Sequence, residues 1–156
     1  MIHIDQIQSF VCYVDRTTAE GGSFGLGMGL PTVPNLAMSV LDSLSTCGAT
    51  IPNPASPLVV GDTTQLVLQP ESWYNIISTF HKGTIQVFVN GKLISTKSGA
   101  SSTVPLCPNA GLLIGAWWDT SSGSGSETLN GKMDEVRLYN RVLNSNEVAA
   151  LAREFK

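Results

Sequence analysis

The segment from residue 131 to residue 147 constrains the fold of this chain most, because its pattern changes abruptly from that of a strand to that of a helix. From Met133 to Tyr139 the side chains alternate between two faces, as a half-buried strand requires. One face carries Asp134, Val136 and Leu138, and the other carries Glu135, Arg137 and Tyr139. The alternation predicts a strand close to the end of the chain.

The residues that follow predict a helix with a defined start. Asn144 is a suitable N-cap, and Glu147 stands where its side chain can bond back to the cap in a capping box. Leu143 can pack against Val148 as a hydrophobic staple. Apolar residues then recur at helical spacing, namely Val148, Leu151, Ala152 and Phe155. We therefore expect a helix of roughly ten residues that docks one apolar face on the rest of the fold.

The run Gly-x-x-Asp-Glu-Val-x-Leu-Tyr-x-Arg-x-Leu-x-x-x-Glu resembles the closing motif of concanavalin A-like jelly-roll domains of the laminin G-like and pentraxin-like type. Two further blocks, 70–92 and 111–115, resemble the central pair of strands and the strand before a ligand-bearing loop in that family. The resemblance extends from about Ser9 to the end of the chain. It implies an all-β antiparallel sandwich with a short C-terminal helix and places Trp73 in the core.

The rest of the chain reads as short strands broken by Gly, Pro, Asn and Ser, which is typical of an all-β sandwich. The dipeptide Asn90-Gly91 predicts a two-residue hairpin turn, and residues 47–57 predict a surface loop. We find no linker or repeat and expect residues 1–156 to form one domain. Further strands are expected at Gln8–Asp15, Ser23–Leu30, Leu36–Leu41 and Gln65–Leu68.

Composition argues against several classes of partner. Only 13% of residues are charged and the net charge is -3, so the composition predicts no electrostatic attraction to nucleic acid or anionic lipid. No apolar run approaches the roughly 18 residues of a membrane span. The start, Met1–Asp5, is not a signal peptide. Either the protein stays inside the cell, or it is extracellular or on the cell surface and its export signal lies outside this segment.

The resemblance also implies a difference from complete members of the family. Those domains begin with further strands, one of which pairs with the last strand, whereas here the strand containing Cys12 comes almost at once. The domain is therefore expected to have lost, replaced or borrowed these strands. Open sheet edges invite pairing, so a homodimer or higher oligomer is predicted.

The loop after Gly115 is the expected ligand site. The resemblance to pentraxins aligns Asp119 and Glu127 with acidic calcium ligands, but Trp117 and Trp118 stand where two oxygen ligands would be needed. Calcium requires about six to eight oxygen ligands. One interpretation is that Asp119 and Glu127 bind calcium, and the other is that they are solvated acids on a loop.

Three further acids enter the calcium reading. Asp15 and Glu20 come from the turn before Gly21 and are candidates to face the same loop end. Asp134 is an alternative, because in many laminin G-like domains an Asp of the closing motif helps to position a calcium on the convex side. The competing interpretation is that Asp134 accepts hydrogen bonds from backbone donors.

The adjacent residues Trp117 and Trp118 point to opposite sides of an extended segment, so only one can be fully buried. An exposed ring beside Asp119 and the polar run 120–126 suits sugar recognition, by stacking together with hydrogen bonding to hydroxyls. Packing or an oligomer interface would also account for these rings.

The three cysteines do not have metal-site spacing, and the histidines, His3 and His81, are distant in sequence. Cys12, at an inward strand position, is expected to behave as a small hydrophobe. Cys47 and Cys107 lie in loop-like contexts and are the favoured disulfide pair, with three reduced thiols as the alternative.

Catalysis is not expected. Glycoside hydrolysis needs two carboxylates that flank one bond, and the neighbours Asp134 and Glu135 face opposite ways on a strand. His3 and His81 are expected to be solvated. Two hypotheses remain: a lectin-like module that binds carbohydrate through the loop from Trp117 to Glu127, or a structural or adhesion domain that meets another protein or a second copy.

Overall fold

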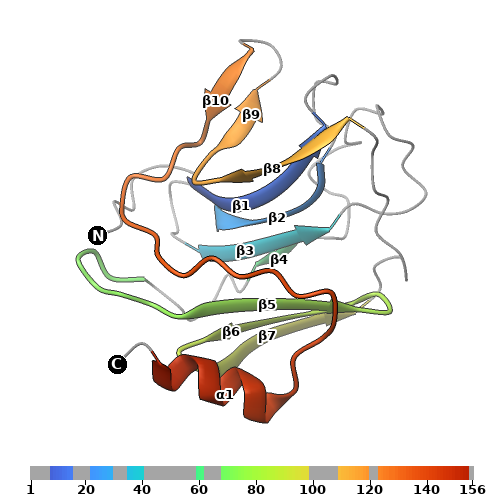
Figure 1. Ribbon diagram of the computed structural model, residues 1–156, viewed down its shortest axis with the longest axis vertical. Coiled ribbons are helices and arrows are strands. Elements are labelled where there is room, and N and C mark those ends of the chain that lie inside the picture. The colour runs from blue at the N-terminus through green and yellow to red at the C-terminus, as the bar shows by residue number, and fades with distance from the viewer. Residues whose placement is uncertain are drawn as a thin grey trace.

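The computed structural model describes residues 8–15, 22–29, 35–40, 59–61, 68–98, 109–119 and 123–154. Within these ranges the chain is built almost entirely of antiparallel strands, followed by one short helix near the C-terminus (Figure 1). The elements are β1 (Gln8–Asp15), β2 (Gly22–Gly29), β3 (Asn35–Val40), β4 (Val59–Gly61), β5 (Ile76–His81), β6 (Thr84–Val89), β7 (Lys92–Ser98), β8 (Ala110–Ile114), β9 (Trp117–Asp119), β10 (Ser124–Ser126) and α1 (Ser145–Glu154).

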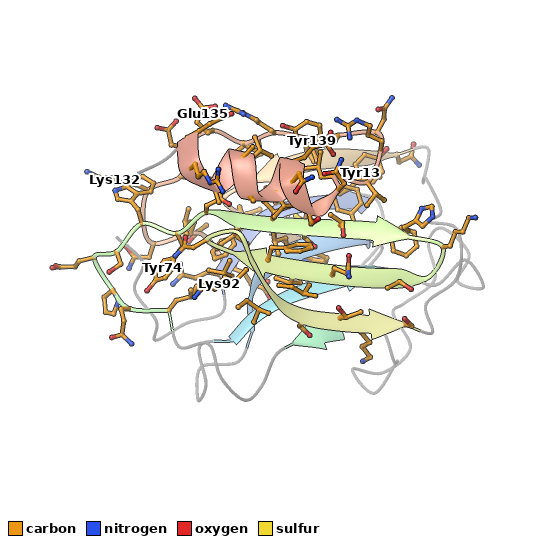
Figure 2. The ribbon with its side chains drawn as sticks, turned by 90° about the horizontal axis from the view of Figure 1, so that it is seen from below. Tyr13, Tyr74, Lys92, Lys132, Glu135 and Tyr139 are labelled. Carbon is orange, nitrogen blue, oxygen red and sulfur yellow. The ribbon has the colours of Figure 1, made fainter. Side chains whose placement is uncertain are left out.

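The strands form an all-β sandwich, as predicted. One sheet has the order β4-β3-β2-β1-β8, a second has the order β5-β6-β7, and β9 and β10 form a separate hairpin. Every paired neighbour is antiparallel. The three-stranded sheet lies between the five-stranded sheet and α1 (Figures 1 and 2).

Strand β6 lies at the centre of the packing because it is buried on both faces. Ile85, Val87 and Val89 alternate toward the five-stranded sheet and join a core with Phe10, whereas Phe88 points the other way and packs beneath α1. This alternation follows from the period of two in a strand. The molecule therefore has two apolar layers, one on each side of the three-stranded sheet.

The predicted turn at Asn90 and Gly91 is confirmed. It joins β6 to β7, with φ angles of 50° at Asn90 and 79° at Gly91, as a tight hairpin requires. The Asn90 amide donates to the Asn75 carbonyl at 2.8 Å, and the Asn75 amide donates to Asn90 Oδ1 at 2.9 Å. The turn is thus bonded to the residue just before β5.

The predicted capping box of α1 is confirmed. Asn144 Oδ1 accepts hydrogen bonds from the amides of Asn146 at 3.0 Å and Glu147 at 3.1 Å, and the Asn144 amide donates to Glu147 Oε2 at 2.8 Å. Leu143 and Val148 are both buried and pack together with Phe88. The staple therefore fixes the start of the helix on the outer face of the three-stranded sheet.

Glu147 makes the stability of this cap pH-dependent. The Arg141 guanidinium first, and the Asn144 amide second, lower the pKa of Glu147 below its ordinary value. A carboxyl whose folded pKa is lowered stabilises the folded state above its unfolded pKa, near 4.3, and loses this contribution as the pH falls through the folded pKa. We expect Glu147→Gln, which can still accept the Asn144 bond, to be less stable than the parent at neutral pH and equal to it in acid. Thermal unfolding of both proteins across this pH range gives the difference between their melting temperatures. A difference that does not change with pH would contradict the lowered pKa of Glu147.

The strand predicted at Met133–Tyr139 is wrong. This segment has no regular secondary structure, and Glu135 has a φ of 51°, which breaks an extended backbone. Val136 and Leu138 are 40% and 60% exposed. Apolar and polar side chains alternate along this segment, but no backbone hydrogen bonds pair it with a described strand. Alternation without a pairing partner is not enough to form a strand.

Two other expectations need correction. Trp73 is 62% exposed rather than in the core, because β5 begins only at Ile76 and Trp73 lies in the connection before it. The strand expected at Gln65–Leu68 is not found at Leu68, which is completely buried but outside any strand. Residues 65–67 and the predicted loop 47–57 lie outside the described residues. The strands expected at Gln8–Asp15, Ser23–Leu30 and Leu36–Leu41 correspond to β1, β2 and β3.

Candidate functional site

The β9–β10 hairpin extends from one end of the sandwich (Figure 1). Its register places Trp117 opposite Ser126, Trp118 opposite Gly125 and Asp119 opposite Ser124. The expectation that the two tryptophan side chains point to opposite sides stays a prediction, because the side chain of Trp118 lies outside the description.

The base of the hairpin is fastened to the five-stranded sheet. Gly115, at a φ of 75°, turns the chain from β8 into β9, a conformation that favours glycine. Its amide donates to the Phe10 carbonyl at 2.7 Å, and its carbonyl accepts from the Leu129 amide at 2.8 Å. Both ends of the hairpin segment are therefore held by backbone bonds, which gives a rigid support to a short exposed element.

Cys12 lies beneath this base. It is fully buried and free, and its Sγ donates to the Ala116 carbonyl at 3.2 Å. Burial first, and the negative charge of Glu127 second, raise the pKa of the Cys12 thiol to about 12. Cys12 therefore stays protonated near neutral pH and acts as a small buried hydrophobe, as predicted. Cys47 and Cys107 lie outside the described residues, so their pairing stays a prediction.

The candidate site residues are placed to different extents. Trp117 is half-buried and Glu127, directly after β10, is exposed with a φ of 47°. The backbones of Trp118 and Asp119 lie in β9, but their side chains lie outside the description, as does the side chain of Asp15 and all of Glu20. Asp15 pairs with Ala110, at the opposite end of β8 from the hairpin base.

Asp134 stands apart from the hairpin residues. It is exposed, and its Oδ1 accepts a hydrogen bond from the Glu135 amide at 2.8 Å. Among the described side chains, no three His, Cys, Asp or Glu residues gather as a metal site would require. Calcium at the set Asp119, Glu127, Asp15 and Glu20, or at Asp134, therefore remains a prediction from the sequence.

Sequence reasoning did not foresee a groove of about 740 Å³ that lies between the two sheets. Its lining includes Trp73, Tyr74 and the segment from Lys132 to Leu143. Figure 2 shows Tyr74 and Lys132 toward one end of the molecule and Tyr139 toward the other. The signal for this wall was the set of apolar residues Val136, Leu138, Tyr139 and Val142, of which the first three lie in the segment that was predicted to be a strand. No helix among the described residues is long and apolar enough to cross a membrane.

A family model and one solved structure support this architecture. The model of the family described as the concanavalin A-like lectin/glucanases superfamily matches residues 10–149. Among solved structures, the CBM40 of the Ruminococcus gnavus IT-sialidase superimposes with a TM-score of 0.62 at 15% identity, covering 96% of this chain and 76% of that chain. An S-layer domain-containing protein from Clostridium thermocellum gives a TM-score of 0.45 at 17% identity, and the match covers 95% of this chain and 64% of that chain. A search of curated proteins finds no match.

Proposed function

Because the chain belongs to the concanavalin A-like lectin/glucanases superfamily, we propose that it is a non-catalytic module that binds carbohydrate through the β9–β10 hairpin. Family membership supports a ligand-binding sandwich but does not identify the ligand, since one fold carries many functions. The choice of carbohydrate rests on the chemistry of the hairpin.

The register of the hairpin is the observation that carries the proposal. The backbone of Trp118 pairs with that of Gly125, which has no side chain. The backbone of Asp119 pairs with that of Ser124, a residue that carries a hydroxyl group. A flat aromatic surface can stack on the C–H face of a sugar ring, and a carboxylate with hydroxyls can bond its hydroxyl groups.

The support for a non-catalytic role is also chemical. Hydrolysis of a glycosidic bond requires two carboxyl groups about 5 to 9.5 Å apart across the bond. Of the described acids near the groove, Glu135 is bound to Arg137 at 2.9 Å, and Asp134 is occupied by a backbone amide. The CBM40 of a sialidase has the same fold, so a module of this shape is compatible with a role in sugar recognition.

Binding to a glycan array tests the proposal, with the parent compared against Trp118→Ala, Trp117→Ala and Asp119→Asn. We expect Trp118→Ala to weaken binding by roughly 1 to 3 kcal/mol, the scale of aromatic stacking on a planar ligand ring. Its melting temperature should stay close to that of the parent, because the proposal makes Trp118 a residue that contacts the ligand and not a part of the core.

Trp117→Ala serves as the comparison, because Trp117 is half-buried and its loss should reduce stability as well. Repeating the array with a chelator separates the two roles of Asp119: direct bonding gives a partial loss that is insensitive to metal, and a calcium role makes binding depend on the metal. If no glycan binds, or if binding survives all three substitutions, the hairpin is not a sugar site.

A further inference from the structure

The β9–β10 hairpin is too short to fix its own orientation. It joins β9 (Trp117–Asp119) to β10 (Ser124–Ser126), and among the described strands neither of the two pairs with a third. A two-stranded hairpin of this kind is at best marginally stable in water. The orientation of the hairpin therefore depends on the contacts at its base, where it leaves the sandwich (Figure 1).

The limb of the chain that enters the hairpin is held by β1. The pairing of β8 with β1 ends at Ile114, and the next residue, Gly115, donates its amide to the Phe10 carbonyl at 2.7 Å. The Ala116 carbonyl then accepts a hydrogen bond from the Cys12 thiol at 3.2 Å. Because these bonds directly continue the pairing of β1 with β8, the position of the entering limb is set by the sheet.

The limb that leaves the hairpin, residues 127–130, lies outside any strand. It begins at Glu127 with a φ of 47°, which is unfavourable for a residue with a Cβ. The Leu129 amide donates to the Gly115 carbonyl at 2.8 Å, a bond that joins the two limbs to each other. The Leu129 side chain packs partly against the core, but an apolar contact of this kind has no preferred direction. A directional bond from this limb to the sheet has to come from another residue.

Gln8, the first residue of β1, supplies this bond. Gln8 is 1% exposed, and its Oε1 accepts a hydrogen bond from the Asn130 amide at 3.1 Å, although the two residues are 122 positions apart in sequence. Losing a donor to a buried amide oxygen is costly, so the buried side chain favours the arrangement in which the Asn130 amide lies against β1. Both limbs are thus bonded to the same end of one strand, the entering limb at Phe10 and the leaving limb at Gln8.

We propose that Gln8 is a positioning residue for the ligand site of the hairpin, which holds the leaving limb on β1 and is too deeply buried to contact the ligand. The inference rests on the proposed binding of carbohydrate by the hairpin. A site that is already ordered binds more tightly, because less conformational entropy is lost on binding. A hairpin released at Gln8 pivots about Gly115 and is in its binding orientation for only part of the time, which weakens the apparent affinity by that fraction.

Hydrogen exchange without sugar tests whether Gln8 holds the hairpin. Gln8→Met keeps a long, unbranched side chain but has no amide oxygen to accept the Asn130 bond. We expect exchange in residues 115–130 to become faster by roughly three- to tenfold, the factor that corresponds to the net loss of one hydrogen bond. Exchange in β6 should stay at the rate of the parent. Equal acceleration in both segments would make Gln8 a residue of general stability and would overturn the positioning role.

The glycan array, read over a series of protein concentrations, tests whether this support matters for binding. Gln8→Met should raise the half-saturation concentration of each bound glycan by a similar factor of roughly three to ten. The matched control is Thr79→Val, because Thr79 is 8% exposed, is the other buried polar residue of the described part of the chain, and belongs to the three-stranded sheet. Thr79→Val should change neither the exchange of the hairpin nor the half-saturation concentrations, whatever its melting temperature.

A second variant removes the same bond from its exposed end. Asn130→Pro has no amide hydrogen to donate, and because Asn130 is exposed, the change removes no buried side chain. It should reproduce the faster exchange and weaker binding of Gln8→Met, and the double variant should bind no more weakly than either single variant. Additive effects would mean that the two residues act separately and would overturn the proposal.

The two measurements distinguish a failure of this inference from a failure of the proposed function. If the parent and Gln8→Met bind glycans with the same half-saturation concentration, Gln8 does not position the site, and carbohydrate binding by the hairpin is unaffected. If the parent binds no glycan on the array, the proposed function is wrong and the positioning role is wrong with it, even where exchange shows that Gln8 holds the hairpin.

Discussion

Replacing Val148 with Asp should lower the free energy of unfolding by about 4 kcal/mol or more, the largest effect of any single change considered. Val148 is 1% exposed and packs with Phe88 and Leu143. The variant loses roughly 1.5 to 3 kcal/mol of apolar burial and adds the cost of placing a carboxylate where it has no partner. Urea unfolding followed by circular dichroism measures the change, and the midpoint should fall sharply.

The control lies two residues further along the helix. Ala150 is exposed, so Ala150→Asp should cost less than about 1 kcal/mol, chiefly through lower helix propensity. Leu151 is only partly buried against the same cluster, and Leu151→Asp should fall between the two. If all three substitutions have the same small effect, α1 does not dock on the three-stranded sheet as described.

The features that sequence predicted correctly are those whose interactions are local. The capping box joins Asn144 to Glu147, and the turn is formed by Asn90 and Gly91, so each is determined by residues a few positions apart. The staple between Leu143 and Val148 is similar. Short-range chemistry of this kind is visible in the sequence, because the chain brings the partners together by itself.

The strand expected at Met133–Tyr139 shows where this reasoning ends. Alternation tells which faces a strand would have, but a strand also needs a neighbour to pair with, and sequence pattern does not reveal whether one is present. Here the segment pairs with no described strand, and Glu135 adopts a positive φ. Trp73 was misplaced for a related reason, since it precedes β5 by three positions and the exact start of a strand is set by pairing.

For the candidate site, the structure describes the backbone of the hairpin and few of its side chains. Sequence indicated that Trp117 and Trp118 face opposite ways, and this stays a prediction, because only the side chain of Trp117 is described. It interpreted residues 120–126 as a flexible loop, whereas Ser124–Ser126 form β10 and pair with β9. Pairing across the hairpin is what brings Gly125 opposite Trp118. This pairing depends on the register of the two strands. The composition and spacing of a polar run of Gly and Ser do not specify that register.

Replacing Gly91 with Ala should cost about 2 to 4 kcal/mol, because two effects add at this position. A φ of 79° is unfavourable for any residue with a Cβ, by about 1 to 2 kcal/mol. The new Cβ would also stand 3.0 Å from the Cβ of Ala152 in α1, so the helix must shift on the sheet. Gly123→Ala is the matched control, since Gly123 has a φ of 64° with no atom within 4 Å of an added Cβ, and it should show the backbone cost alone.

A double-mutant cycle separates the contact from the backbone strain. Ala152→Gly removes the atom that the new Cβ meets, at a cost of about 1 kcal/mol in helix propensity. In that background Gly91→Ala should cost no more than Gly123→Ala does in the parent, because only the strain at positive φ remains. The coupling energy between positions 91 and 152, measured by urea unfolding, then reports how firmly α1 is held against the β6–β7 turn. Strict additivity of the two substitutions would mean that the turn and the helix do not touch in solution. The described contact between α1 and the β6–β7 turn would then be wrong.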